Sequence, residues 1–214
     1  MVLGIFGAGG TGKELYDLIM RYPDTVKCYE SIIFVDDKIG VKETYGVQVY
    51  TFAQVVEKYS PKELCFLIAL GVPEDRESIS HKIKKKGFSL TRWVHPRAEV
   101  ARSAQIAEGV IVMDSFIDIN ASIGKNTFIY YKAAVGHDTI IKENCIISVG
   151  SFVGGHSIVE SNVYLGPGAS VRDRLHIGKG SVVGINSAVY SNIPDGCSAI
   201  GNPARTAPKS SKMF

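Results

Sequence analysis

Two histidines, His137 and His156, stand at positions of the sequence that suit acid–base chemistry. His137 is followed directly by Asp138. The unperturbed pKa of histidine lies close to neutral pH, so an exposed imidazole can serve as a general base. A neighbouring carboxylate can raise the basicity of that imidazole or fix its tautomer. We therefore take His137 as the candidate general base and Asp138 as its candidate partner.

The same two histidines raise the question of a metal site. His156 falls almost directly above His137 when the repeat described below is counted, so the two rings are expected to be neighbours. Zinc needs a third protein ligand. No further histidine falls at the matching position, because His176 lies elsewhere in the repeat and His81 and His95 are expected to be structural. We therefore expect no metal ion.

A glycine-rich segment near the start of the chain has the spacing of a phosphate-binding loop. It satisfies the pattern GxGxxG directly after a predicted strand over 2–6 and before a predicted helix over 13–21. Glycines let the backbone approach a ligand closely, and the start of the helix presents free N–H groups to a phosphate. The candidate substrate-binding residues of this segment are Gly7, Gly9, Gly10, Gly12 and Lys13.

Asp36 and Asp37 end a second predicted strand over 31–35, where an acid can bind a ribose hydroxyl. Only half of the usual two-lobed dinucleotide fold precedes the repeats, which favours a single nucleotide over NAD. Glu14 stands where a Walker A loop has its magnesium-binding Ser or Thr, which argues against a nucleoside triphosphatase. A glycine turn that serves only the packing of the sheet remains the alternative.

The elements that must position this loop alternate between strand and helix. After the strands over 2–6 and 31–35 come a predicted helix over 52–59, a strand over 64–70 and a helix over 74–86. This alternation predicts a small Rossmann-like parallel sheet. We assign residues 1–92 to this nucleotide-binding α/β domain.

The elements that must position His137 belong to a repeat of six residues. Six fits neither a helix nor the alternation of a sheet, but it fits a triangular coil in which each short face sends one aliphatic side chain inward. Small residues stand two positions before most of these aliphatic residues and suit tight corners. We expect the six-residue spacing to slip by one residue between Ile106 and Ile111. We predict a left-handed parallel β-helix over about 97–190, within a domain over 93–214. The aliphatic positions are Ile111, Ile117, Ile123, Ile129, Val135, Ile141, Ile147, Val153, Val159, Leu165, Val171, Ile177, Val183 and Val189.

Composition excludes several classes of partner. The 214 residues carry a net charge of only +3, which does not indicate binding to nucleic acid or to a membrane surface. The lysine run over 82–86 has no interleaved aromatic residues and is expected to be the end of a helix. Widely spaced cysteines indicate a reducing compartment, and neither a signal peptide nor a membrane span is evident. We expect a cytoplasmic protein.

Several segments together resemble the hexapeptide-repeat sugar acyltransferases of the NeuD/PglD-like group, which includes sialic-acid O-acetyltransferases and bacillosamine-pathway N-acetyltransferases. The resemblance implies a homotrimer with an N-terminal nucleotide-sugar domain and active sites between neighbouring β-helices. It also implies acetyl-CoA as cosubstrate, His137 as catalytic base and Asp138 as its paired acid. The segments that carry the resemblance are Gly7-Ala8-Gly9-Gly10-Thr11-Gly12-Lys13, Phe34-Val35-Asp36-Asp37, Val94-His95-Pro96, Val135-Gly136-His137-Asp138 and Ile200-Gly201-Asn202-Pro203-Ala204.

Two positions depart from the family pattern. The resemblance places Tyr130 where N-acetylating members usually have a substrate-binding Asn, and Ile146 where they often have a second His near the CoA thiol. We expect His156 to take over part of the role of that second His. Gly154 and Gly155, in the same coil, are candidate backbone donors to the oxyanion of the acetyl group. Ile146, Gly154, Gly155 and His156 are therefore the candidate cofactor-binding residues.

The sequence therefore predicts an acetyl-CoA-dependent acetyltransferase that acts directly on an amino group of a nucleotide-linked sugar in polysaccharide biosynthesis, with His137 as base. Two alternatives stay open, namely a sugar O-acetyltransferase of the same fold and a non-catalytic trimer that binds nucleotide sugars. A Rossmann-type oxidoreductase is disfavoured because a β-helix offers no pocket for hydride transfer.

Overall fold

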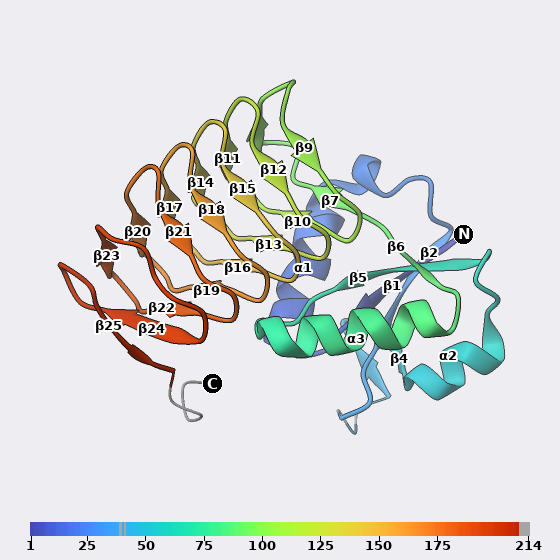
Figure 1. Ribbon diagram of the computed structural model, residues 1–214. Coiled ribbons are helices and arrows are strands. Elements are labelled where there is room, and N and C mark those ends of the chain that lie inside the picture. The colour runs from blue at the N-terminus through green and yellow to red at the C-terminus, as the bar shows by residue number, and fades with distance from the viewer. Residues whose placement is uncertain (39, 41, 210–214) are drawn as a thin grey trace. The chain divides into compact units, whose positions relative to one another are not determined.

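The computed structural model describes residues 1–38, 40 and 42–209. The chain forms two compact units, one made of Met1–Gly71 and Asp75–Trp93, the other of Val72–Glu74 and the residues from Val94 onward. The first is an α/β unit with a parallel sheet and the second is a β-helix, which confirms the predicted fold class (Figure 1). Among the described residues, no helix has both the length and the apolar character needed to cross a membrane.

The sheet of the first unit is built around its first strand. Strand β1 (Val2–Phe6) lies between β2 (Ser31–Val35) and β5 (Leu64–Ile68), both parallel to it, and all five of its residues are buried. Such a central position explains its uninterrupted apolar sequence. The strand order is β3-β4-β2-β1-β5-β6.

The edges of this sheet were not predicted. Strand β6 (Ser89–Leu90) continues the parallel sheet beside β5, and β4 (Val47–Tyr50) lies parallel to β2. Strand β3 (Glu43–Thr44) pairs with β4 in an antiparallel hairpin whose turn residues, Tyr45 and Gly46, both have positive φ angles. Two positive φ angles are typical of a tight hairpin turn.

In the described part of the chain, three α-helices and one short 3-10 helix connect these strands. They are α1 (Gly10–Arg21), η1 (Pro23–Thr25), α2 (Phe52–Lys58) and α3 (Pro73–Lys85). Helix α1 starts earlier than predicted, so that Gly10 and Gly12 of the glycine-rich segment belong to its first turn. Thr51 and Gln54 form a capping box at the start of α2, which fixes that boundary.

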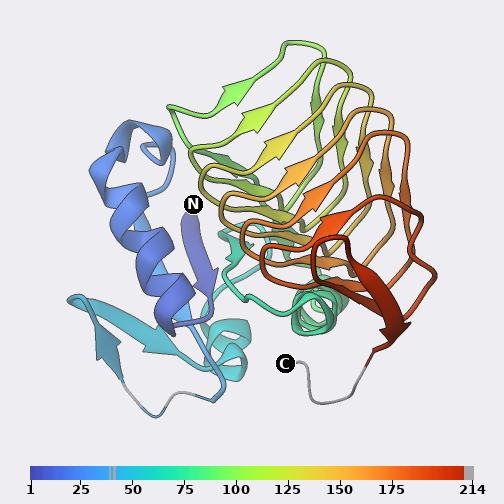
Figure 2. The ribbon, with the colours of Figure 1, turned by 90° about the vertical axis from the view of Figure 1, so that its left-hand side faces the viewer.

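The second unit is a coil built mainly of two-residue strands, and its described strands stack into three sheets that are parallel except for the last strand. Figure 2 shows the stacked coils with their three flat faces. The first sheet holds β7 (Trp93–Val94), β10 (Ile111–Val112), β13 (Phe128–Ile129), β16 (Ile146–Ile147), β19 (Tyr164–Leu165), β22 (Val182–Val183), β24 (Cys197–Ile200) and the antiparallel β25 (Arg205–Pro208). The second holds β8 (Glu99–Val100), β11 (Phe116–Ile117), β14 (Ala134–Val135), β17 (Phe152–Val153), β20 (Ser170–Val171) and β23 (Ala188–Val189). The third holds β9 (Gln105–Ile106), β12 (Ser122–Ile123), β15 (Ile140–Ile141), β18 (Ile158–Val159) and β21 (His176–Ile177).

The second residue of each short strand fills the interior of the coil. From Ile117 to Val189 these aliphatic side chains are at most 3% exposed. The small residues before the strands are buried as well, and several of those with hydroxyl groups donate to a carbonyl of the next coil. Thr127 Oγ1, for example, donates to the carbonyl of Lys142 and accepts from the N–H of Cys145. Small polar residues therefore fit these positions because neighbouring coils satisfy them.

The first predicted inward residue was wrong by one position. The register pairs Val112 with Ile129 and Ile111 with Phe128, so Val112 is the inward residue and Ile111 is not. The slip consequently lies between Val112 and Ile117, where a corner is one residue short, rather than between Ile106 and Ile111. Both candidates are aliphatic, so spacing alone could not separate them.

Candidate active site

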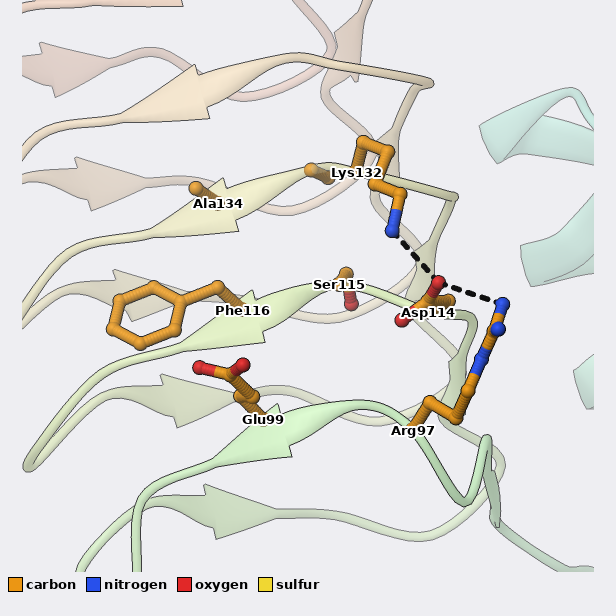
Figure 3. A pocket seen from close by; sticks show the side chains of 8 residues that line it. Arg97, Glu99, Asp114, Ser115, Phe116, Lys132 and Ala134 are labelled. Atoms are coloured by element: carbon orange, nitrogen blue, oxygen red, sulfur yellow. Dashed lines mark hydrogen bonds and ion pairs between the residues drawn. The ribbon is translucent and has the colours of Figure 1, made fainter.

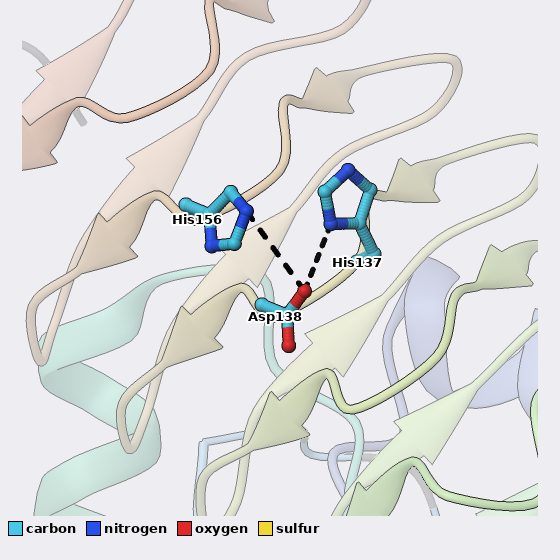
Figure 4. Close-up of side chains that lie close together, drawn as sticks. All are labelled: His137, Asp138 and His156. Atoms are coloured by element: carbon cyan, nitrogen blue, oxygen red, sulfur yellow. Dashed lines mark hydrogen bonds and ion pairs between the residues drawn. The ribbon is translucent and has the colours of Figure 1, made fainter.

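His137, Asp138 and His156 lie at one corner of the β-helix, in two successive coils. His137 and Asp138 connect β14 to β15, and His156 connects β17 to β18 one coil later (Figure 4). Asp138 and His156 occupy the same corner position, with φ angles of 56° and 58°. This left-handed conformation is tolerated best by Gly, Asn, Asp and His. The corner therefore holds these two side chains at a fixed place in the fold.

Asp138 holds the imidazole of His137 from one side. The Nδ1 atom of His137 lies 2.9 Å from Asp138 Oδ2, and the side chain of Asn120 donates to Asp138 Oδ1 at 3.0 Å. The hydrogen bond from His137, followed by that from Asn120, lowers the pKa of the Asp138 carboxyl below its ordinary value. An ionised carboxylate accepts, so Nδ1 of His137 carries the proton and Nε2 keeps its lone pair. The arrangement leaves Nε2 as the basic atom.

Gly155 bounds the same imidazole from the next coil. A Cβ atom added to Gly155 would lie 2.8 Å from His137 Nε2 and 2.9 Å from its Cε1. Atoms at these distances overlap, so only glycine leaves room for the ring in its present place. Asp138 and Gly155 together fix where Nε2 lies.

The two candidate oxyanion donors differ in their hydrogen bonds. The N–H of Gly154 donates to the carbonyl of Val171 at 2.9 Å within the ladder between coils. The N–H of Gly155 donates no hydrogen bond within the part of the chain that the structure describes. Of the pair, Gly155 alone has an N–H without a hydrogen-bond acceptor among the described residues.

His156 lies where counting along the repeat placed it. Its ring and that of His137 are edge to face, with centroids 4.9 Å apart. Its Nε2 atom lies 4.0 Å from Asp138 Oδ2. Figure 4 shows both rings turned toward the carboxylate of Asp138. Beside the two imidazoles, the carboxylate of Asp138 is a third group of a type that can bind a metal ion.

Tyr130 and Ile146 do not join this corner within one chain. Tyr130 follows β13, at the opposite end of β14 from His137, and its ring stacks on Phe128 with centroids 4.1 Å apart. Ile146 is buried in β16, on the sheet that contains β13. A single chain therefore does not bring either residue to His137.

The shortened corner of the β-helix forms a small charged cavity that the sequence analysis missed. Asp114 accepts from Arg97 at 3.1 Å and from Lys132 at 2.7 Å, and the cavity beside them measures about 220 Å³ (Figure 3). The hydrogen bond from Lys132 lowers the pKa of the Asp114 carboxyl. The only signal in the sequence was the break in the six-residue spacing.

The glycine-rich loop of the first unit contains glycines of two kinds. Gly7 has a φ angle of +109°, and a Cβ on Gly12 would lie 1.8 Å from the carbonyl oxygen of Gly7, so both are required by the fold. A Cβ on Gly9 or Gly10 would meet nothing within 4 Å. Among the described residues, no side chain caps the start of α1, and Lys13 lies in its first turn, half-buried. These open glycines and uncapped N–H groups have the geometry of an anion site.

The two acidic residues at the end of β2 have separate roles. Asp36 accepts from the N–H of Ala8 in the glycine-rich loop at 2.9 Å and so ties that loop to β2. Asp37 faces the helices instead, because it accepts from the N–H of Phe52 at 2.8 Å and pairs with Lys82. Burial raises the pKa of Asp37, but the hydrogen bonds from Lys82 and Phe52 outweigh it and leave the pKa below its ordinary value.

A cavity of about 350 Å³ lies beside Asp36 at the carboxyl end of the parallel sheet. Phe6 and Leu70 supply its apolar wall, and Asp75 and Ile79 of α3 line it as well. Ligands of open parallel α/β sheets bind at this edge. The loop and the cavity therefore form the candidate nucleotide site of the first unit.

Comparison with known proteins agrees with both units. Residues 2–83 match the PglD N-terminal domain family. UDP-N-acetylbacillosamine N-acetyltransferase of Bacillus subtilis (strain 168) is 32% identical over 115 residues, which cover 52% of this chain and 50% of that enzyme. The chain spans half or less of the length of the curated relatives that it matches.

Solved structures match along nearly the whole chain. The acetyltransferase domain of PglB from Neisseria gonorrhoeae FA1090, in complex with acetyl coenzyme A, has a TM-score of 0.87 and 27% identity, with 96% of this chain and 98% of that chain covered. A histidine-to-asparagine variant of perosamine N-acetyltransferase from Caulobacter crescentus, in complex with CoA and GDP-perosamine, has a TM-score of 0.88 and 27% identity, with 98% of each chain covered. Residues 2–83 therefore carry the PglD N-terminal domain, and the chain as a whole is similar to PglD-like hexapeptide-repeat sugar acyltransferases.

Proposed function

We propose that this protein transfers an acetyl group from acetyl-CoA to an amino group of a nucleotide-linked sugar, with His137 as the general base. The observation that carries the proposal is the placement of His137 Nε2, which Asp138 and Gly155 hold from two sides. Solved relatives at 27% identity are complexes with acetyl coenzyme A and with CoA and GDP-perosamine, which supports the choice of substrates.

The reaction needs one proton acceptor and one oxyanion donor. A neutral amine attacks the thioester carbonyl while Nε2 of His137 accepts the proton that the amine loses, a step worth about 10²–10⁴-fold in rate. In this proposal the N–H of Gly155, which has no acceptor among the described residues, donates to the oxyanion of the tetrahedral intermediate. Collapse of the intermediate breaks the carbon–sulfur bond, and the proton held by His137 passes to the departing thiolate of CoA.

The first unit supplies the nucleotide site in this proposal. The diphosphate of the acceptor binds to the free N–H groups at the start of α1, where Gly9 and Gly10 leave room for it. Lys13 adds positive charge there, and Asp36 faces the adjoining cavity, where the nucleoside fits.

A homotrimer with sites between neighbouring β-helices fits the separation of Tyr130 from His137. The two residues lie at opposite ends of β14, so a sugar that contacts both must lie between two chains. The outer face of the second sheet also exposes Phe116 and Phe152, which are 42% and 45% exposed. Exposed aromatic side chains of this kind are typical of surfaces that a partner covers.

The cellular setting follows from the substrates. We place the reaction in the cytoplasm, in the supply of acetylated sugars for polysaccharide biosynthesis.

The test is acetyl transfer by the His137→Asn variant. With a panel of UDP-, GDP- and dTDP-linked amino sugars, CoA release should fall by at least about 10²-fold relative to the wild type. His176→Asn is the matched control, because His176 also faces a carboxylate but lies on the third sheet. Near-normal turnover by His137→Asn would refute the assignment of the base. Transfer only to sugars without an amine would favour the O-acetyltransferase, and no CoA release with any sugar would favour the binding trimer.

A further inference from the structure

The corner that holds His137 also gathers three metal-ligating groups. One nitrogen from each of His137 and His156 and one oxygen of Asp138 all lie within 4.8 Å of one another. The three side chains are between 37% and 48% exposed, so an ion in solution can reach them. Two imidazoles and one carboxylate form a ligand set that zinc uses in proteins, with one position left open.

The backbone holds these three residues close together, and their side chains can rotate to fit an ion. Asp138 and His156 are held at equivalent positions of stacked coils, and the N–H of His156 donates to the carbonyl of His137 at 2.9 Å. In a tetrahedral site with zinc bonds of about 2.0–2.2 Å, ligand atoms lie roughly 3.4 Å apart. His156 Nε2 must therefore approach Asp138 Oδ2 from 4.0 Å, and His137 Nδ1, now at 2.9 Å from that oxygen, must draw back slightly. Exposed imidazoles make such moves by small rotations about their side-chain bonds.

The charges around the cluster do not oppose a cation strongly. Arg174 occupies the same corner position in the next coil, but it pairs with Asp173 at 3.6 Å. Arg172 also lies 3.9 Å from that carboxylate. On the other side the neighbour is the uncharged Asn120.

A second histidine–carboxylate pair of this chain provides a contrast. His176 lies 3.2 Å from Glu160, but the same carboxylate pairs with Lys142 at 2.8 Å. The second group beside the Glu160 carboxylate is therefore the ammonium group of Lys142, whereas the second group beside Asp138 is the imidazole of His156. The pair of His176 and Glu160 therefore lacks the second imidazole that completes the group at Asp138.

We propose that His137, Asp138 and His156 form a zinc site and that zinc inhibits the enzyme by occupying it. A neutral imidazole that binds zinc through one ring nitrogen carries its proton on the other, so His137 has no nitrogen left to accept the proton of the attacking amine. The inhibitory part rests on the proposed function of His137, whereas the binding of zinc does not.

Calorimetric titration of the untagged chain with zinc chloride tests the binding. One zinc ion should bind per chain, and Co²⁺ at the same place should give the visible absorption of a tetrahedral site. His156→Asn removes a ligand but keeps a residue type that tolerates the left-handed backbone. We expect it to weaken zinc binding by at least about 10-fold, while His176→Asn binds as the wild type does.

Thermal melting shows whether His156→Asn is folded. If it is folded and binds zinc as tightly as the wild type does, the proposal is overturned. A wild type that binds no zinc would overturn it as well. Zinc should also inhibit acetyl transfer by the wild type over the concentration range in which it binds. Because calorimetry and the Co²⁺ spectrum need no turnover, a failure of the proposed function leaves the metal test intact. Zinc binding without inhibition would overturn the inhibitory part.

Discussion

Replacing Gly155 by alanine tests directly whether the position of His137 Nε2 matters. The added methyl group would lie 2.8 Å from Nε2, whereas ordinary van der Waals contact begins at 3.4 Å, so the ring must retreat by about 0.6 Å. A displacement of about 1 Å at a reacting group can lower the rate 10²-fold. We expect kcat to fall by about 10- to 100-fold, with the KM for the nucleotide sugar nearly unchanged.

Steady-state measurement of CoA release, combined with thermal melting, checks this prediction. The φ angle of Gly155 is not positive, so alanine fits the backbone and the variant should fold. Alanine also keeps the N–H that we assign to the oxyanion. The decisive control is the double variant, because Gly155→Ala should cost nothing further once His137 is Asn. An unchanged kcat in the single variant, or an equal loss in both backgrounds, would refute the reasoning.

Three further predictions concern ligand binding, pH and the core. Gly9→Ala should weaken binding of the nucleotide sugar in calorimetry without lowering Tm. Gly12→Ala should instead lower the Tm of the first unit, because its Cβ would lie 1.8 Å from the carbonyl oxygen of Gly7. A loss of Tm in Gly9→Ala with unchanged binding would count against the loop as a ligand site. Burial lowers the pKa of His95 below 6.5, so the stability due to its neutral ring is complete above that pH and declines as the pH falls through the lowered pKa. Melting between about pH 7.5 and 5 should show this decline, and His95→Gln should reduce it. Ile147 is fully buried in the coil, and Ile147→Ala should cost about 2–5 kcal/mol in urea unfolding.

The β-helix could be predicted from the sequence because each coil repeats the same physical requirement. An inward aliphatic residue is needed every six positions from Ile117 to Val189, and the structure has one at each. The slip near Ile111 could not be placed, because two adjacent aliphatic residues satisfy the period equally well and only pairing between coils separates them. The hairpin of β3 and β4 escaped prediction for a related reason, since its strands are short and mostly polar.

The candidate site could be predicted only as far as the phase of the repeat reaches. Counting placed His156 beside His137, and the rings are indeed neighbours. It could not show that Gly155 bounds the ring, because contact between coils depends on the rotamer of His137 rather than on its position. The position of Tyr130 was also missed. Tyr130 lies in the corner before β14 and His137 in the corner after it, and the six-residue spacing does not by itself distinguish one corner from the next.

The corner itself explains why function is hard to read from its residues. Successive coils place Asn120, Asp138, His156 and Arg174 at the same position, and all four have φ angles between 56° and 58°. Asn, Asp and His are the non-glycine residues that this conformation tolerates best. They are also the residues that donate, accept and ligate. A polar residue at such a corner can therefore be there because it tolerates the left-handed backbone, and its type alone says little about function. What separates Asp138 from Asn120 is its contact with an imidazole in the preceding position, which only the three-dimensional arrangement reveals.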